Sequence, residues 1–109
     1  MNTYKKGKQA EEKAIKFLKK KGFNIITKNF YCKGGEIDII AFKDDVFHFI
    51  EVKSGKNFEP IYNVTPKKIK NITKCIYKFL SKNNITLPFC ISVIIIKEDN
   101  ITFYKNITL

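Results

Sequence analysis

Three charged side chains interrupt two apolar stretches of the sequence, where a buried strand would normally carry none. Asp38 lies in the first stretch, and Glu51 and Lys53 flank Val52 in the second. Unpaired charges in an apolar sheet are costly, so such groups usually pair with one another or bind a metal ion. Two carboxylates and an ammonium group brought together could therefore form either a metal and phosphate site or a cluster of ion pairs.

The stretch from Gly34 to Lys53 must position these groups, and its composition predicts a β-hairpin. Both halves are rich in β-branched and aromatic residues, and a short polar turn joins them. Side chains alternate across a strand, so Glu51 and Lys53 are expected on one face, as are Glu36 and Asp38. Pairing of the two strands can then bring Asp38 beside Glu51 and Lys53.

Small and acidic residues at fixed positions extend this pattern along the chain. In order, they are Gly7-x-x-x-Glu11-x-x-Ala14, Asn29, Gly35-Glu36-Ile37-Asp38, Glu51-Val52-Lys53 and Val64-x-x-x-Lys68. An acid followed by a strand that carries Glu-x-Lys is the active-site pattern of the PD-(D/E)xK nucleases. The ordered set resembles the bacterial YraN family over nearly the whole chain, and that family is similar to archaeal Holliday-junction resolvases.

The resemblance implies a metal-dependent catalytic site made of Asp38, Glu51, Lys53 and Glu11. Its expected ligands for Mg²⁺ or Mn²⁺ are Asp38, Glu51, the carbonyl oxygen of Val52, and Glu11. Hard oxygen ligands favour these ions over zinc. Such an ion would polarise the scissile phosphate and lower the pKa of its bound water. A lysine with an ordinary pKa of about 10.4 is a poor base, so Lys53 is expected to orient the water or the phosphate.

Glu11 is open to two interpretations. Apolar residues at helical spacing predict a helix over residues 7–21, in which Glu11 borders the buried face and Glu12 points away. A carboxylate at the start of a helix is favoured by the helix dipole alone. The alternative, implied by the resemblance, is that Glu11 contributes to the metal site.

Hydrophobic periodicity and turn residues predict the remaining elements. These are a helix at residues 65–82 and strands at 23–31, 89–96 and 101–104. The order α-β-β-β-α-β-β predicts an α/β fold, with a mixed central sheet flanked by helices. The resemblance identifies this as a restriction-endonuclease-like, PD-(D/E)xK core. We expect one such domain over residues 1–109.

The charge of the chain favours polyanionic partners. Its 109 residues carry a net charge of +11, and all 21 basic residues are lysine. The absence of arginine disfavours base reading by bidentate arginine–guanine pairs and fits contact with the phosphate backbone better. The alternative is compositional, because abundant Lys, Asn and Ile also suit an AT-rich genome.

Five lysines are candidates for contact with nucleic acid, with DNA preferred over RNA. They are Lys56, Lys67, Lys68, Lys70 and Lys74. Lys70 and Lys74 belong to a stripe that repeats every four residues on the outer side of the second helix, which could equally be an ordinary solvated face. Lys68 differs, because it projects beside the apolar face and can reach toward the hairpin.

The cysteines and the termini indicate no metal cluster and no export signal. The spacing of Cys32, Cys75 and Cys90 matches no zinc pattern, and Cys75 and Cys90 are expected to pack as small hydrophobic residues. His48 is interpreted as a packed or surface residue rather than a ligand. No apolar run approaches the roughly 18 residues of a membrane span, and the N-terminus lacks a secretory pattern, so we expect a cytoplasmic protein without a membrane partner.

Three functions remain open from the sequence. The first is a metal-dependent endonuclease that hydrolyses phosphodiester bonds, in DNA and in branched DNA. The second is a non-catalytic nucleic-acid-binding module that uses the lysine-rich faces. The third is a protein-interaction subunit whose charge is compositional. A homodimer would suit a junction substrate, by analogy with the resolvases.

Overall fold

A computed structural model describes residues 3–55 and 65–107 of the chain, with side chains from residue 7 onward. The elements are α1 (Thr3–Lys20), β1 (Asn24–Cys32), β2 (Gly35–Lys43), β3 (Val46–Gly55), α2 (Pro66–Lys82), β4 (Phe89–Lys97) and β5 (Asn100–Tyr104). The predicted order of helices and strands is confirmed, and boundaries shift by only a few residues.

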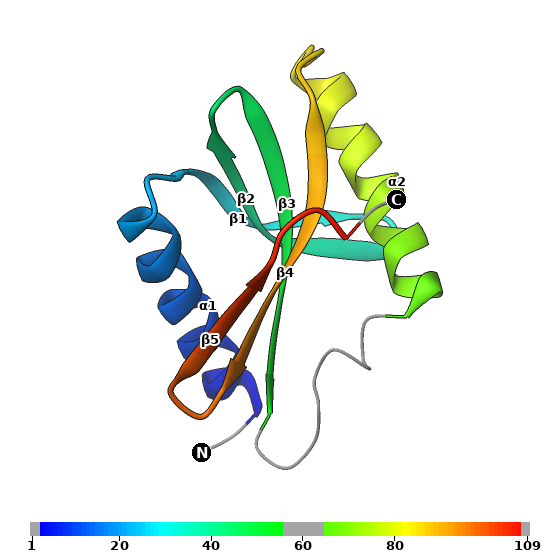
Figure 1. Cartoon of the computed structure of the whole chain (residues 1–109). Helices are drawn as coiled ribbons and strands as arrows, with labels where there is room; N and C mark the ends of the chain where they lie inside the picture. The colour runs from blue at the N-terminus through cyan, green and yellow to red at the C-terminus, as the bar shows by residue number, and fades with distance from the viewer. Residues whose placement is uncertain (1–2, 56–64, 108–109) are drawn as a thin grey trace.

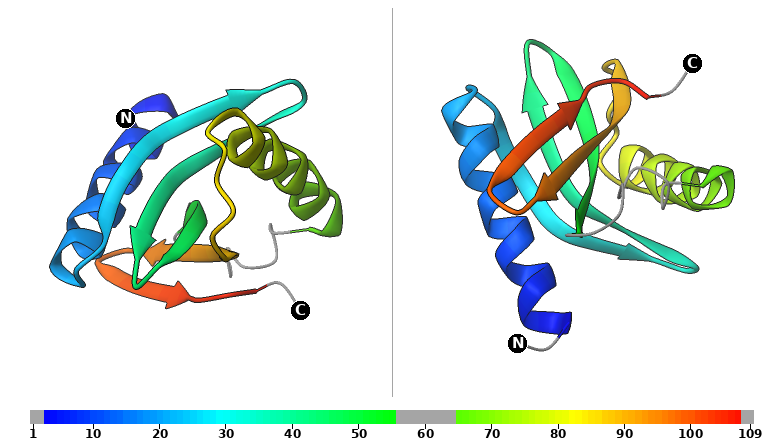
Figure 2. Two further views of the ribbon diagram at one scale, coloured as in Figure 1. Left: turned by 90° about the horizontal axis from the view of Figure 1, so that it is seen from above. Right: turned by 60° about the horizontal axis from the view of Figure 1, so that its bottom comes forward.

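The five strands form one mixed sheet with the spatial order β1-β2-β3-β4-β5. Neighbouring strands are antiparallel except β3 and β4, which are parallel. α2 is the crossover that joins this parallel pair. Figures 1 and 2 show α1 on one face of the sheet and α2 on the other, which confirms the predicted α/β layers.

Each face of the sheet carries its own hydrophobic core. The α1-side core consists of Ala10, Ala14, Leu18, Phe23, Ile39, Ala41, Ile50, Ile94 and Ile96. The α2-side core consists of Ile37, Ile40, Phe47, Phe49, Ile72, Cys75, Ile76, Phe79 and Ile91. Both faces are covered, which explains why β4 is an almost continuous apolar run rather than an alternating one.

Local signals in the sequence set the ends of the helices. Gly22 has a φ of +90°, a left-handed conformation that glycine adopts without strain, and it follows the last turn of α1. At the start of α2, the Thr65 hydroxyl accepts a hydrogen bond of 3.2 Å from the backbone N–H of Lys68, and Pro66 takes the first helical position. Among the described residues, neither helix is long and apolar enough to cross a membrane.

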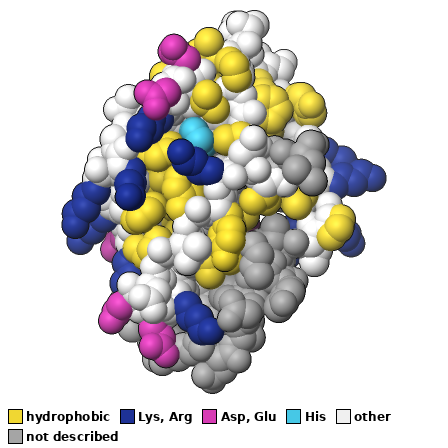
Figure 3. All heavy atoms as spheres, viewed as in Figure 1, with side chains coloured by type: hydrophobic (Ala, Val, Ile, Leu, Met, Phe, Trp, Pro, Cys, Tyr) yellow, Lys and Arg dark blue, Asp and Glu magenta, His cyan; other side chains and the backbone are white. Residues whose placement is uncertain are grey.

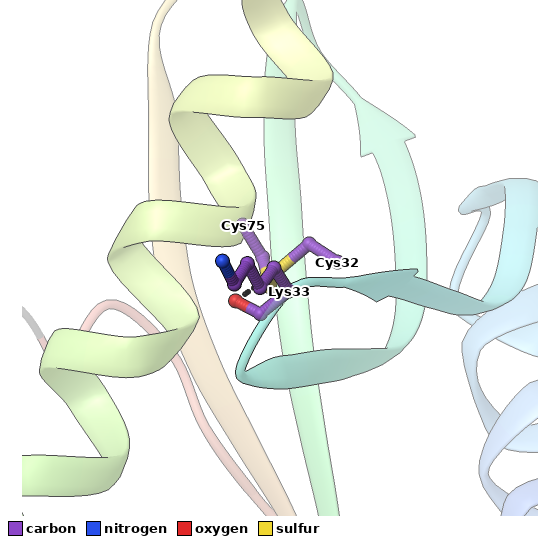
Figure 4. Close-up of a disulfide and its surroundings, with 3 residues drawn as sticks. All are labelled: Cys32, Lys33 and Cys75. Carbon is purple, nitrogen blue, oxygen red and sulfur yellow. Dashed lines mark hydrogen bonds between the residues drawn. A yellow bond between two sulfur atoms is a disulfide. The ribbon is translucent and has the colours of Figure 1, made fainter.

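A disulfide joins the end of β1 to the middle of α2. Cys32 and Cys75 are bonded, with their Cα atoms 5.6 Å apart (Figure 4). The expectation that Cys75 packs only as a small hydrophobic residue is therefore wrong: it lies in the α2-side core and is also cross-linked. The physical reason is non-local, because the fold brings together two cysteines that lie 43 residues apart in sequence.

The other cysteine behaves as predicted. Cys90 is free and buried, and its Sγ lies 3.2 Å from Nδ1 of His48. The His48 ring also stacks edge-on against Phe23, with centroids 4.9 Å apart. His48 is therefore a packed core residue, as expected.

We predict that the disulfide makes a large contribution to the stability of the fold. Closing a loop of this length restricts the unfolded chain and corresponds to at most about 4 kcal/mol in the chain-entropy account. Cys32→Ser should lower the free energy of unfolding toward that amount, measured by urea denaturation. A reducing agent should lower the midpoint of the wild type to that of the variant and leave the variant unchanged. A wild-type midpoint that is insensitive to reduction would contradict the prediction.

Candidate functional site

The central sheet divides in two at the candidate site. The last pair between β2 and β3 is Ile39 with Ile50, so Asp38 and Glu51 are the first residues beyond it. From there β2 remains paired with β1, while β3 remains paired with β4. Figure 1 shows the end of the β1–β2 hairpin running toward α2 while β3 continues in a different direction. We call this end of the hairpin, residues 29–38, the hairpin arm.

Asp38 bridges the division through its side chain. Its Oδ2 accepts a hydrogen bond of 2.8 Å from the backbone N–H of Val52, and the residue is only 7% exposed. The carboxyl group thus replaces a main-chain acceptor at the point where the β2–β3 ladder ends. Val52 itself packs against the α1-side core, on the face opposite to Lys53, as the alternation predicts.

The regular alternation of β2 fails at Asp38. Ile37 packs in the α2-side core and Ile39 in the α1-side core, although residues two apart on a regular strand share a face. Opposite Asp38 on β1, Asn29 has a φ of +54°, a left-handed conformation in which asparagine is enriched. The expectation that Glu36 and Asp38 share one face is therefore wrong, because Asp38 points along the sheet toward β3.

Two lysines and a glutamate meet on the α2 side of this division. Lys53 Nζ lies 3.0 Å from Oε1 of Glu51, and their side chains are 25% and 12% exposed. Burial opposes the charge on Lys53, but the hydrogen bond and the attraction from Glu51 outweigh it and raise the pKa of Lys53. Hydrogen bonding to Lys53, helped by burial and repulsion, lowers the pKa of Lys68. Lys68 therefore reaches the site from the first turn of α2, as predicted.

The acid groups around Asp38 oppose its ionisation. Burial and then repulsion from Glu51 raise the pKa of Asp38 to about 8, against the hydrogen bond from Val52. Weaker repulsion comes from Glu11 and Glu36. Without a bound metal ion, the Asp38 carboxyl is therefore mostly protonated at neutral pH.

Glu11 lies at the edge of the same group. It is half-buried while Glu12 is exposed, as the helical spacing predicts. Burial raises the pKa of Glu11, a hydrogen bond from the Asn29 side chain opposes this, and repulsion from Glu36 adds to it. Asn29 makes this contact from β1. Nothing in its local sequence indicates that its amide would meet Glu11 from another element.

A pocket of about 160 Å³ lies beside these groups, between the hairpin arm, β3 and α2. It is lined by Gly34, Gly35, Glu36, Glu51, Lys68, Asn71 and Ile72. Gly35 packs closely on α2, since a Cβ there would lie 3.5 Å from Sγ of Cys75. Asn71 also lines the pocket, which the sequence did not indicate. In the sequence it occupies an ordinary polar position of the predicted helix.

The oxygen donors of the described residues suit a magnesium ion that is also coordinated by water and substrate. They suit less well a metal site made entirely of protein ligands. Within the described part of the chain, no three Asp, Glu, His or Cys side chains converge as a ready-made metal centre. Mg²⁺, however, usually takes one or two carboxylates and completes its coordination with water and substrate phosphate. Asp38 and Glu51, which repel each other in the absence of a cation, are donors of that kind. Glu11 and the Val52 carbonyl stay predictions as further ligands.

The lysines predicted to contact nucleic acid divide into two groups. Lys68 lines the pocket, while Lys67, Lys70 and Lys74 are exposed on α2. Figure 3 shows lysine side chains in dark blue at both flanks of one face of the molecule. Lys56, like Val64 of the ordered motif, lies outside the described residues.

The fold and the site define a class of protein. It is an α/β domain whose mixed sheet separates into two parts at a site that contains two carboxylates and two lysines. Residues 10–96 match the sequence pattern of the uncharacterised protein family UPF0102. Three relatives that carry this family name cover nearly the whole chain. One from Helicobacter hepaticus is 53% identical over 109 residues, which is 100% of this chain and 99% of the relative. One from Wolinella succinogenes is 51% identical over 104 residues, covering 95% and 96%. One from Helicobacter pylori is 50% identical over 103 residues, covering 94% and 90%.

The chain therefore belongs to the UPF0102 family, which is the YraN family that the ordered motifs predicted.

We predict that the stability of the metal-free protein falls as the pH rises from 7 to 9. The folded Asp38 holds its proton up to about pH 8, whereas an unfolded aspartate loses it near pH 4, so the folded state binds more protons between these values. For one proton, the free energy of unfolding cannot change by more than about 1.4 kcal/mol per pH unit. His48, whose pKa burial lowers, acts in the opposite direction only below about pH 6.5.

The measurement is chemical denaturation in EDTA at several pH values for the wild type and for Asp38→Asn. The amide can still accept the hydrogen bond from Val52 but does not titrate, so the slope above pH 7 should largely disappear. Equal slopes in the two proteins would contradict the burial of an ionisable Asp38.

Proposed function

We propose that this protein is a metal-dependent endonuclease that hydrolyses phosphodiester bonds in DNA. The observation that carries the proposal is that the buried Asp38 carboxyl lies near Glu51 at the division of the sheet, while Lys53 Nζ lies 3.0 Å from Oε1 of Glu51. Burial and then repulsion from a second acid raise the pKa of Asp38, and pKa values perturbed in this way are concentrated at functional sites. The element order and the mixed sheet also fit a PD-(D/E)xK core.

Asp38 and Glu51 would hold Mg²⁺ or Mn²⁺, with Glu11 at the edge of the site. The ion, when bound, polarises the scissile phosphate and activates a water molecule. Asp38 contributes a carboxylate that is already oriented by the Val52 N–H, so little rearrangement is needed when its proton leaves. Two carboxylates held about 4 Å apart would repel by roughly 4 kcal/mol at an effective dielectric near 20, which a divalent cation relieves.

Lys53 supplies positive charge rather than a base. Its pKa is raised above the ordinary value, so its ammonium group persists at neutral pH. Held at the site by Glu51, it can donate a hydrogen bond to a phosphate oxygen or to the attacking water as negative charge develops.

Lys68 provides the second contact for the same phosphate. Lys53 and Lys68 lie within hydrogen-bonding reach of each other, and their amino groups repel when both are charged. The hydrogen bond, burial and this repulsion together lower the pKa of Lys68. An anionic group between Lys53 and Lys68 removes the repulsion. The pocket that Lys68 lines thus suits a phosphate of the nucleic-acid backbone, and the net charge of +11 favours the approach of such a polymer.

We predict that Asp38→Asn and Lys53→Met impair cleavage for different reasons. In single-turnover assays with Mn²⁺ on single-stranded, duplex and branched DNA, Asp38→Asn should lose activity together with the rise in melting temperature that Mn²⁺ causes in the wild type. Lys53→Met should keep most of that rise but cleave about 100- to 1,000-fold more slowly, as expected when one donor to developing charge is lost.

Lys16→Met serves as the matched control, because Lys16 is an exposed lysine on α1 away from the site. It should cleave at the wild-type rate. Normal cleavage by Lys53→Met, together with a large loss of stability in EDTA, would contradict the catalytic role and favour a structural ion pair.

A second candidate function is a nucleic-acid-binding module without catalysis, and the exposed lysines of α2 favour it. Lys70, Lys74 and Lys78 are all exposed on the outer side of the helix. At this spacing they form one ridge, which can follow a phosphate backbone without reading bases.

We predict that this ridge contributes to the salt dependence of DNA binding. Replacing its three lysines by glutamine should flatten the plot of log affinity against log salt concentration by roughly one unit for each phosphate that the ridge no longer neutralises. The matched control replaces Lys13, Lys16 and Lys20, which are exposed on α1, and removes the same charge. Equal slopes for the two triple variants would show that the ridge is only part of a general positive field.

A further inference from the structure

The hairpin arm carries an aromatic side chain that the fold does not use. Tyr31 is 70% exposed, more than any other large apolar or aromatic side chain in the described part of the chain. Among residues 7–55 and 65–107, its ring has no aromatic contact and its hydroxyl has no hydrogen bond. A large ring held in water on an ordered strand is available for contact with a partner outside the chain.

The register of the arm shows which way Tyr31 points. Phe30 packs against the α2-side core, with its ring 5.3 Å from that of Phe79, and Cys32 bonds to Cys75 of α2. Tyr31 lies between Phe30 and Cys32, so it projects to the opposite side of the arm. Its direct partner on β2 is Glu36, whose side chain shares that side.

That side of the arm borders the cluster of acidic side chains at the candidate site. Glu36 raises the pKa values of both Asp38 and Glu11 by repulsion, so its carboxylate lies within electrostatic reach of both. Tyr31 is therefore a direct neighbour of a residue that belongs to the electrostatic surroundings of the site. Tyr31 also lies only two residues along β1 from Asn29, which is opposite Asp38, so a nucleotide next to a phosphate bound at the site can reach it.

The arm also holds Tyr31 in place. The disulfide on the adjacent Cys32 ties this part of β1 to α2 (Figure 4), and Phe30 anchors the other side. A ring on a fixed backbone loses little conformational entropy when a planar group stacks on it, and tyrosine has few side-chain torsions to restrict.

The charges around Tyr31 favour one part of a nucleotide. Glu36 repels a phosphate, whereas an uncharged, planar base suits the ring. Lys33 on the arm and Lys28 just before it are exposed and can attract phosphates on either side of such a base. Bases inside a duplex are already stacked on each other, so only an unpaired base is available to the ring.

We propose that Tyr31 is a stacking platform for an unpaired base of the nucleic acid, next to the candidate site. This assignment rests on the proposed function and deepens it, because it makes the preferred substrate one with unpaired nucleotides beside the scissile bond, such as forked DNA. Tyr31 then determines specificity and takes no part in the chemical step.

The test measures binding of a forked DNA that carries 2-aminopurine at the first unpaired nucleotide, with the corresponding full duplex as comparison, in EDTA. Loss of one base–aromatic stack should weaken binding of the fork by about 5- to 150-fold in Tyr31→Ala and in Tyr31→Leu. Tyr31→Phe should bind like the wild type, because the ring is kept. Binding of the duplex should be the same in all four proteins.

Fluorescence of the 2-aminopurine should be quenched by the wild type and by Tyr31→Phe, and not by the other two variants. Tyr104→Ala is the matched control, since Tyr104 is 43% exposed on β5 at the opposite edge of the sheet. It should behave like the wild type.

Three results would overturn the assignment. Unchanged binding of the fork by Tyr31→Ala, or an equal loss on fork and duplex, refutes stacking while the nuclease proposal stands. Failure of the wild type to bind either DNA refutes the assignment and the proposed function together.

Discussion

The hydrogen bond from the Val52 N–H to Asp38 Oδ2 is the interaction on which the arrangement of the site depends. It places a side chain where the β2–β3 ladder would continue with main chain, so the two arms of the sheet separate there without an unpaired N–H on β3. The same bond fixes the carboxyl beside Glu51 in a buried position. The fold and the chemistry of the site are thus coupled through one contact of 2.8 Å.

The coupling has an electrostatic consequence. Burial, and then repulsion from Glu51, favour the protonated form of Asp38 and outweigh the hydrogen bond from Val52, which favours the ionised form; this explains the raised pKa of Asp38. On the other side of Glu51, hydrogen bonding to Lys53, burial and repulsion from Lys53 lower the pKa of Lys68. Acids crowd at one end of the site and amino groups at the other. A metal ion among the acids would relieve the first repulsion, and a phosphate oxygen between the two lysines would relieve the second. The ion pair between Glu51 and Lys53 relieves neither fully.

Local patterns predicted the parts of the structure that local interactions determine. Thr65 and Pro66 begin α2 because capping depends on adjacent backbone, and the spacing of Ile72, Ile76 and Phe79 predicted its buried face. Glu51 and Lys53 share a face because the alternation of β3 is regular. The break in alternation at Asp38 could not be predicted, since it occurs where β2 separates from β3, opposite the left-handed Asn29 of another strand. The disulfide escaped prediction for the same reason, because its cysteines meet only through packing of α2 on the hairpin arm.

That packing decides where the hairpin arm stands relative to β3. Beyond Ile39 the arm is no longer paired with β3, so its position depends on Phe30 and Ile37 in the α2-side core, on the close approach of Gly35 to α2, and on the disulfide. Such bonds are rare in the reducing cytoplasm, where this chain was expected. In a reducing compartment only the apolar contacts would remain, and the arm that carries Glu36 would be held less firmly. The electrostatic surroundings of Asp38 would then depend on the redox state of a bond that touches none of the acid groups.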